Sequence, residues 1–225
     1  MPSEPNLALG RHPERRLHDA RAVHDVLDSQ LICHLAFSVD GWPYAVPTVH
    51  ARDGDRLLIH GSTLSRMVAD LTAGLPVCVT VTEVGGIVAA RSAFNHSINY
   101  RSVMVFGNAV LVDDPAEKLA ALRTIVDHVL PGRWDEVRPP TRQELRATAV
   151  LAVPLDRATA KARSGAPVDA PADRRARVWS GVVPLHPAFA EPELVPDDVA
   201  DLPTPRSVEA LIDSTNRGRG RSAGE

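Results

Sequence analysis

Residues 31–41 read Leu31-Ile32-Cys33-His34-Leu35-Ala36-Phe37-Ser38-Val39-Asp40-Gly41, and this stretch decides the fold class. Apolar side chains occupy every second position from Leu31 to Val39, which is the spacing of a strand with one buried face. The dipeptide Asp40-Gly41 follows directly and is typical of a tight hairpin turn. We therefore expect a strand over 31–39 that turns at once into an antiparallel partner.

Similar strand patterns continue after this hairpin. The alternation predicts strands at 43–51, 56–60, 77–83, 87–93, 101–112, 148–155 and 177–183. Pro47 indicates an edge or a bulge in its strand, and Gly85-Gly86 indicates a turn between two strands. Helices are predicted at 19–29, at 65–73, from Pro115 and from Thr141. Six or seven of these strands, joined by short turns and with helices as inserts, predict a mainly β fold built as an antiparallel Greek-key barrel. A doubly wound sheet would need more helices between its strands.

Composition and charge exclude several classes of function. The chain has 225 residues, with 25 basic and 28 acidic side chains and a formal charge of −3. A nucleic-acid binder usually carries a strong basic excess, so we expect no nucleic-acid partner. Two cysteines without a CxxC pair, and histidines without metal-site spacing, predict no metal site. No apolar run approaches the roughly 18 residues of a membrane helix, and the N-terminus lacks a signal-peptide core, so we expect a cytoplasmic protein with no membrane contact.

Three regions differ in composition. Residues 1–16 are polar and read as an N-terminal arm, and residues 17–186 carry the strand and helix patterns. Residues 187–225 form a Pro-rich acidic extension that ends in a Gly/Arg segment, which we expect to be a disordered tail. Within this extension, residues 207–213 could form a short helix.

The segment His60-Gly61-Ser62-Thr63-Leu64-Ser65-Arg66-Met67 leaves one predicted strand and opens a predicted helix. Free backbone N–H groups at a helix start, together with hydroxyls and an Arg, form an anion site. The first turn has no acidic residue, so Arg66 opposes the helix dipole unless an anion is bound. A Ser or Thr cap with a surface Arg is the plainer interpretation. The segment is therefore a candidate phosphate site.

A second polar segment, residues 91–102, lies between two predicted strands. Loops held between strands often carry functional residues, and this one ends in Asn99-Tyr100-Arg101. A solvated connection whose Tyr and Arg cover the rim of the barrel is the alternative. Tyr100 and His96 are the candidates for a catalytic acid or base.

These segments together resemble a known family. The order is His60-Gly61-Ser62-Thr63-x-Ser65-Arg66 at a helix start, Val77-Cys78-Val79-Thr80-Val81-Thr82, and then Ser97-x-Asn99-Tyr100-Arg101-Ser102-Val103. It is similar to the flavin-binding split-barrel proteins related to pyridoxamine phosphate oxidase, in the branch that includes nitroimidazole-resistance (Nim) proteins. The resemblance runs from about residue 17 to 186 and includes Val178-Trp179-x-Gly181 near its end.

The resemblance implies a homodimeric six-stranded split barrel with one flavin at each end of the dimer interface. For the flavin phosphate it implies His60, Gly61, Ser62, Thr63, Ser65 and Arg66. For the isoalloxazine ring it implies Val46, Pro47 and Thr48, with Tyr100, Arg101 and Ser102 reaching the cofactor from the partner subunit. Trp179 would stand near the C-terminal wall of the site.

The sequence also departs from the true oxidase. Arg66 is followed by Met67 where that enzyme has a second basic residue, and the segment Tyr44–Val49 has no cation. Loss of these cations weakens the case for a phosphorylated pyridoxal-type substrate. The departures leave the cofactor open between FMN, FAD, a deazaflavin and haem. In a haem-binding variant, His50 or His60 could be the axial ligand.

The function expected from this resemblance is that of a flavin-dependent oxidoreductase. FMN is the preferred cofactor and a small organic molecule is the expected substrate. The hydride chemistry itself belongs to the flavin. The alternative is a binding protein that stores or senses a flavin or haem without turnover.

Overall fold

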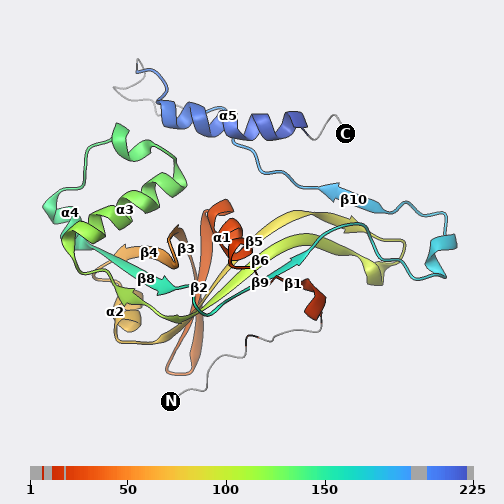
Figure 1. Cartoon of the computed structure of the whole chain (residues 1–225), viewed down its shortest axis with the longest axis horizontal. Helices are drawn as coiled ribbons and strands as arrows, with labels where there is room; N and C mark the ends of the chain where they lie inside the picture. Colours follow the sequence, from red (N-terminus) through yellow and green to blue (C-terminus); the bar gives the residue numbers. More distant parts are fainter. Residues whose placement is uncertain (1–6, 8–11, 18, 194–201, 222–225) are drawn as a thin grey trace.

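The computed structural model describes residues 7, 12–17, 19–193 and 202–221 (Figure 1). Within them, ten strands form one antiparallel sheet, which confirms the mainly β fold expected from the sequence. The strands are β1 (Arg16–Leu17), β2 (Ile32–Val39), β3 (Trp42–Asp53), β4 (Arg56–Ser62), β5 (Pro76–Ala89), β6 (Ser97–Asn108), β7 (Val110–Leu111), β8 (Thr148–Pro154), β9 (Ala158–Arg163) and β10 (Gly181–Pro184). Their spatial order is β1-β9-β6-β5-β2-β3-β4-β8-β7, and β10 pairs with β5.

The sheet curls around one apolar core. Closure brings β6 against β8, where a Cβ on Gly107 would stand 3.7 Å from a methyl group of Val153. Alternate residues of the strands fill the interior, including Leu35 of β2 and Val79 of β5. Helix α1 (Ala20–Ser29) adds Val26 and Leu27 to the same core. Beyond the barrel, β5 and β6 extend as a long ribbon that carries β10 (Figure 1).

A second apolar layer lies on the outside of the barrel. Helix α3 (Pro115–Val129) packs Ala121 and Ile125 against Leu58 of β4 and Val150 of β8. Short 3-10 turns η1 (Pro13–Arg15), η2 (Ala93–Asn95), η3 (Arg133–Glu136) and η4 (Asp173–Arg175) lie between the longer elements. The remaining helices are α2 (Arg66–Thr72), α4 (Arg142–Ala147) and α5 (Arg206–Arg221).

Local helix signals in the sequence are confirmed. The Asp114 carboxylate accepts a hydrogen bond from the N–H of Glu117, so it caps α3. Thr141 and Glu144 form the expected capping box at α4. Gly74 has a φ of +96° directly after α2, which is the left-handed conformation that glycine adopts without strain.

One expectation about the strands is wrong, and one strand is not predicted. Gly85-Gly86 does not turn the chain between separate strands over 77–83 and 87–93, because β5 continues through it and only shifts register against β6 between Val84 and Gly86. The pair is a bulge that tertiary pairing with β6 and β10 keeps in the strand. Strand β9 was not expected, because Ala158–Arg163 lacks a strong alternation.

Other boundaries differ less. The expected strand over 101–112 begins at Ser97 and ends at Asn108, and the expected strand over 177–183 is β10 from Gly181. Pro47 is confirmed on an edge segment, since β3 pairs with β4 only from His50 onward.

The C-terminal extension contains a longer helix than expected. α5 spans Arg206–Arg221, so it is longer than the short helix expected over 207–213 and includes residues 217–221 of the Gly/Arg segment. One physical reason is an anchor at its start, where the N–H of buried Ser207 donates to Glu136 at 3.1 Å. The disordered tail stays a prediction. Most of the expected arm over 1–16, the acidic residues 194–201 and residues 222–225 lie outside the described residues. The domain boundaries at 17 and 186 stay predictions.

Candidate functional site

The turn from β4 into α2 is fixed by backbone hydrogen bonds. The N–H of Ser65 donates to the Ser62 carbonyl at 2.9 Å, and the N–H of Leu64 donates to the Ser62 hydroxyl at 3.2 Å. The N–H of Thr63 donates to the Ala147 carbonyl at 2.9 Å, which ties the turn to the end of α4. These bonds hold the hydroxyls of Ser62 and Thr63 at the surface, beside the start of the helix.

The start of α2 carries a positive charge without a capping side chain. Ser65 is the N-cap residue, but its side chain makes no cap hydrogen bond, and the first turn holds no acidic residue. Among the described residues, Arg66 has no carboxylate partner. The macrodipole makes a helix start unfavourable for a cation and favourable for an anion. An anion bound here would relieve that repulsion.

An aromatic ring connects this helix start to β3. The guanidinium carbon of Arg66 lies 5.9 Å from the centre of the Tyr44 ring. Further along β3, Val46, Pro47 and Thr48 pair with β2, and Pro47 is exposed to solvent. The structure therefore brings the Arg66 end of the predicted phosphate segment close to the strand predicted to line the ring.

The predicted residues on β6 lie elsewhere in the same chain. β5 and β2 separate β6 from β3, and three strand spacings amount to about 14 Å. Tyr100 lies opposite Val84 of β5, beyond the stretch in which β5 pairs with β2, and Ser102 lies opposite Thr82. Arg101 is engaged within the chain, with its Nε donating to Glu83 at 2.7 Å. A single chain does not bring these three residues to the helix start.

The remaining candidates lie on the outer part of the ribbon. Trp179 is 66% exposed and rests on Gly181, where a Cβ would stand 2.9 Å from the indole. His96 is exposed, and its Nδ1 lies 2.9 Å from the Ser92 carbonyl. His96 lines an open cavity of about 670 Å³ together with Phe94 and residues of η1. Neither catalytic candidate, Tyr100 or His96, stands beside Arg66 within one chain.

The side chain of His60 lies in a cavity that the sequence did not reveal. The ring is half-buried, makes no hydrogen bond with any described residue, and has its Nδ1 enclosed without a partner. Burial lowers the pKa of this imidazole. The cavity has a volume of about 400 Å³, and its other lining residues are Leu122, Val126, Trp134, Val137, Arg138, Pro140, Glu144 and Thr148. They come from α3, η3, the loop before α4, α4 and the first residue of β8, about 60 to 90 residues downstream.

His50, the other predicted axial ligand, is enclosed in the protein. It has no exposed surface, and its Nε2–H donates to the Leu27 carbonyl at 3.0 Å. Its ring lies 5.4 Å from that of His128, centre to centre. Burial lowers the pKa of His50 to about 4. A side chain so enclosed offers no room for a planar cofactor.

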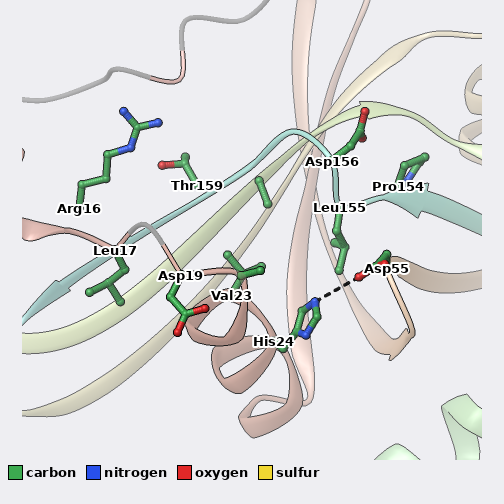
Figure 2. A pocket seen from close by; sticks show the side chains of 12 residues that line it. Arg16, Leu17, Asp19, Val23, His24, Asp55, Pro154, Leu155, Asp156 and Thr159 are labelled. Atoms are coloured by element: carbon green, nitrogen blue, oxygen red, sulfur yellow. Dashed lines mark ion pairs between the residues drawn. The ribbon is translucent and has the colours of Figure 1, made fainter.

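A further pocket opens beside α1 at one end of the barrel. Figure 2 shows Arg16, Asp19, His24 and Thr159 around it. The cavity has a volume of about 590 Å³, and His24 Nε2 lies 3.6 Å from a carboxylate oxygen of Asp55. Charges of both signs line it. The described residues contain no cluster of His, Cys, Asp or Glu with metal-binding geometry. No helix among them is long and apolar enough to cross a membrane.

Comparison with known proteins places this fold in a family. The sequence profile described as pyridoxamine 5'-phosphate oxidase matches residues 19–162. The chain belongs to the pyridoxamine 5'-phosphate oxidase-like family. The resemblance seen in the sequence is thereby confirmed, and so is the split-barrel fold. No curated protein sequence matched the chain.

Two solved structures are similar to this family member over nearly their whole length. One is the FAD and haem binding protein from Mycobacterium smegmatis, with 38% identity, a TM-score of 0.85, and coverage of 88% of this chain and 97% of the other. The second is the flavocytochrome Anf3 from Azotobacter vinelandii, with 35% identity, a TM-score of 0.85, and coverage of 90% and 94%. A protein from Bacteroides thetaiotaomicron assigned to 5-nitroimidazole antibiotic resistance is similar in fold alone. It has 22% identity, a TM-score of 0.56, and coverage of 65% and 86%.

Proposed function

We propose that this protein is a flavin-dependent oxidoreductase that binds FAD together with haem and acts on a small organic molecule. The observation that carries the proposal is the 38% identity, over 97% of its length, to a protein whose bound groups are FAD and haem. When bound, flavin supplies two-electron chemistry and haem supplies one-electron chemistry. FAD replaces FMN as the preferred cofactor because the similar protein binds FAD.

The flavin phosphates are proposed to bind at the turn between β4 and α2. The hydroxyls of Ser62 and Thr63, the uncapped N-cap residue Ser65 and the unpaired Arg66 support this assignment. The isoalloxazine ring would lie along Val46, Pro47 and Thr48. Gly61 belongs to this site through its backbone: an added Cβ would stand 3.1 Å from Val68, so a larger residue would press on α2.

A homodimer is proposed because one chain does not assemble the whole site. The three strand spacings between β3 and β6 keep Tyr100, Arg101 and Ser102 away from Arg66. A second copy packed on the sheet would supply these residues, and Trp179, to the flavin of the first. A cofactor site shared in this way requires two subunits.

The test is to identify what the purified full-length chain carries. We expect flavin absorption bands together with a Soret band, and mass spectrometry of the released cofactors should give FAD and haem b. A protein that stays colourless after incubation with FAD, FMN and haemin would contradict the proposal. NADH and NADPH are then added under anaerobic conditions, followed by an organic electron acceptor. Bound flavin that is neither reduced nor reoxidised would indicate a storage or sensing protein instead.

A further inference from the structure

We infer that haem binds in the cavity between the outer face of the barrel and α3, with His60 as its axial ligand. This inference rests on the haem-binding function proposed above and assigns a place to the haem. The cavity is the one of about 400 Å³ described above, and we call it the α3 cavity. Its volume is within the usual range of about 300–1,000 Å³ for ligand pockets.

The first argument is the state of the His60 side chain. Its ring lines the α3 cavity and makes no hydrogen bond with a described residue. A half-buried polar ring without a partner is unfavourable. A bond from Nε2 to iron would give this ring a polar interaction that the described residues do not provide.

The second argument is the composition of the cavity wall. Leu122 and Val126 of α3 face the cavity with Val137 and Pro140 from the loop before α4. Trp134 of η3 adds an indole that is partly buried. A porphyrin is a flat and largely apolar molecule, and aliphatic and aromatic side chains bury such surfaces well.

The third argument is the charge at the rim. Arg138 lines the α3 cavity, is largely exposed, and donates hydrogen bonds from both terminal nitrogens to Glu144, at 2.8 and 2.6 Å. A haem carries two propionates that point toward solvent. The Nε–H and one Nη2–H of Arg138 donate to no described residue, and they would donate to one propionate in a charge-assisted hydrogen bond.

The position of His60 also suits electron transfer to a flavin. One residue, Gly61, lies between His60 and Ser62 at the end of β4, and the two positions are about 7 Å apart along the strand. The ring of His60 faces the α3 cavity, while the proposed phosphate site begins at Ser62. Haem and flavin would therefore occupy adjacent sites on one strand end.

The test replaces the proposed ligand and then restores it chemically. In the full-length protein, His60→Gly should lose its Soret band, and its haem content by pyridine haemochrome should fall at least fivefold. Added imidazole should restore a low-spin or high-spin ferric spectrum, because free imidazole can fill the space left by the side chain. The matched control is His186→Gly, which removes an exposed histidine just after β10 and should keep its haem.

A second pair of variants tests the cavity without touching the ligand. Val137→Glu places a carboxylate in the apolar wall and should weaken haemin binding at least tenfold. Val129→Glu is the control, since Val129 is similarly exposed but does not line the cavity. Because both side chains are exposed, a glutamate at either position should leave the fold intact. A difference in haemin affinity between the two variants would therefore come from the cavity.

The outcomes separate the inference from the function on which it rests. A wild-type protein that never binds haem contradicts the proposed haem function. Haem that remains in His60→Gly with an unchanged spectrum, or that is lost in His186→Gly instead, overturns the assignment to His60 while the function stands. Equal haemin affinities for Val137→Glu and Val129→Glu would place the haem outside the α3 cavity.

Discussion

The guanidinium of Arg66 lies over the ring of Tyr44, with its central carbon 5.9 Å from the ring centre. Tyr44 in turn stacks on Phe37 across the hairpin, with ring centres 5.5 Å apart. A cation–π contact at an exposed site contributes about 0.5–1 kcal/mol. This contact orients the arginine toward β3 without using its hydrogen-bond donors, so those donors remain available to a phosphate.

Replacing Arg66 should therefore weaken flavin binding. Arg66→Ala is expected to lose roughly 1.5–3 kcal/mol of binding free energy, the range for a hydrogen bond to a charged group. This corresponds to roughly a tenfold to hundredfold higher Kd for FAD. Fluorescence titration of the apoprotein measures it, with exposed Arg21→Ala on α1 as the control. Equal affinities for the two variants would show that the helix start does not hold the flavin phosphates.

Dimerisation should depend on the outer face of the sheet, by which we mean the side that carries Ile32, His34, Ala36, Cys78, Thr80, Thr82 and Met104. These positions alternate with interior residues on β2, β5 and β6, and Ile32 is 46% exposed in the single chain. Thr80→Arg should place a charge at the centre of a buried interface and produce monomers.

Sedimentation velocity checks the dimer prediction on the flavin-loaded protein. The wild type should sediment as a dimer, and Thr80→Arg should sediment as a monomer with at least tenfold weaker FAD binding, because the site is proposed to be shared. The control Arg21→Glu reverses a charge on α1 and should stay dimeric. A monomeric wild type with full flavin content would contradict the shared site.

Cysteine reactivity offers an independent measure of the same interface. Cys33 is fully buried in the barrel, and burial raises the pKa of its thiol to about 12. Cys78 belongs to the outer face and is partly exposed in the single chain. In the dimer both thiols should react slowly with a thiol reagent. In Thr80→Arg, Cys78 should react at least tenfold faster and Cys33 should not change, as peptide mass mapping would show.

Gly86 controls whether β10 remains attached to β5. Its φ is +155°, and an added Cβ would stand 2.7 Å from the Val183 carbonyl oxygen, closer than real Cβ contacts come. Gly86→Ala should therefore destabilise the protein by roughly 1–3 kcal/mol and loosen β10. Hydrogen exchange of residues 181–184 should accelerate. The control Gly107→Ala meets its nearest atom at an ordinary 3.7 Å and should leave that segment protected.

Features encoded by adjacent residues could be predicted from the sequence. The Asp40-Gly41 turn has positive φ at both residues, and the capping box at Thr141 closes as expected, because each depends on a few residues in a row. Segments that depend on distant partners could not be predicted. Gly85-Gly86 would turn a free chain, but pairing with β6 and β10 keeps it extended.

The candidate site shows the same division. The sequence identifies His60 through Arg66 as a strand end followed by a helix start, and the structure confirms both elements. It does not reveal that the His60 ring lines the α3 cavity, since the walls come from Leu122 onward and only the packing of α3 brings them close. Nor does the sequence show which of His60 and His50 is accessible to a ligand, because the complete burial of His50 depends on the folded core.

The buried His50 should make stability depend on pH. Its pKa is about 4 in the folded protein, lowered first by burial and then by His128, while Asp28 acts in the opposite direction. In the unfolded chain a histidine has a pKa near 6.5, so between these values the unfolded state binds the extra proton. The contribution of His50 to the free energy of unfolding should have its full value above about pH 7, and it should fall as the pH drops from about 6.5 to 4. The total loss is about 3 kcal/mol, after which this contribution is constant.

Urea unfolding at pH 7 and pH 5 measures the loss. His50→Gln keeps a donor for the Leu27 carbonyl but cannot titrate, so its stability should fall less over the same interval. An identical fall in both proteins would mean that His50 does not take up the proton on unfolding.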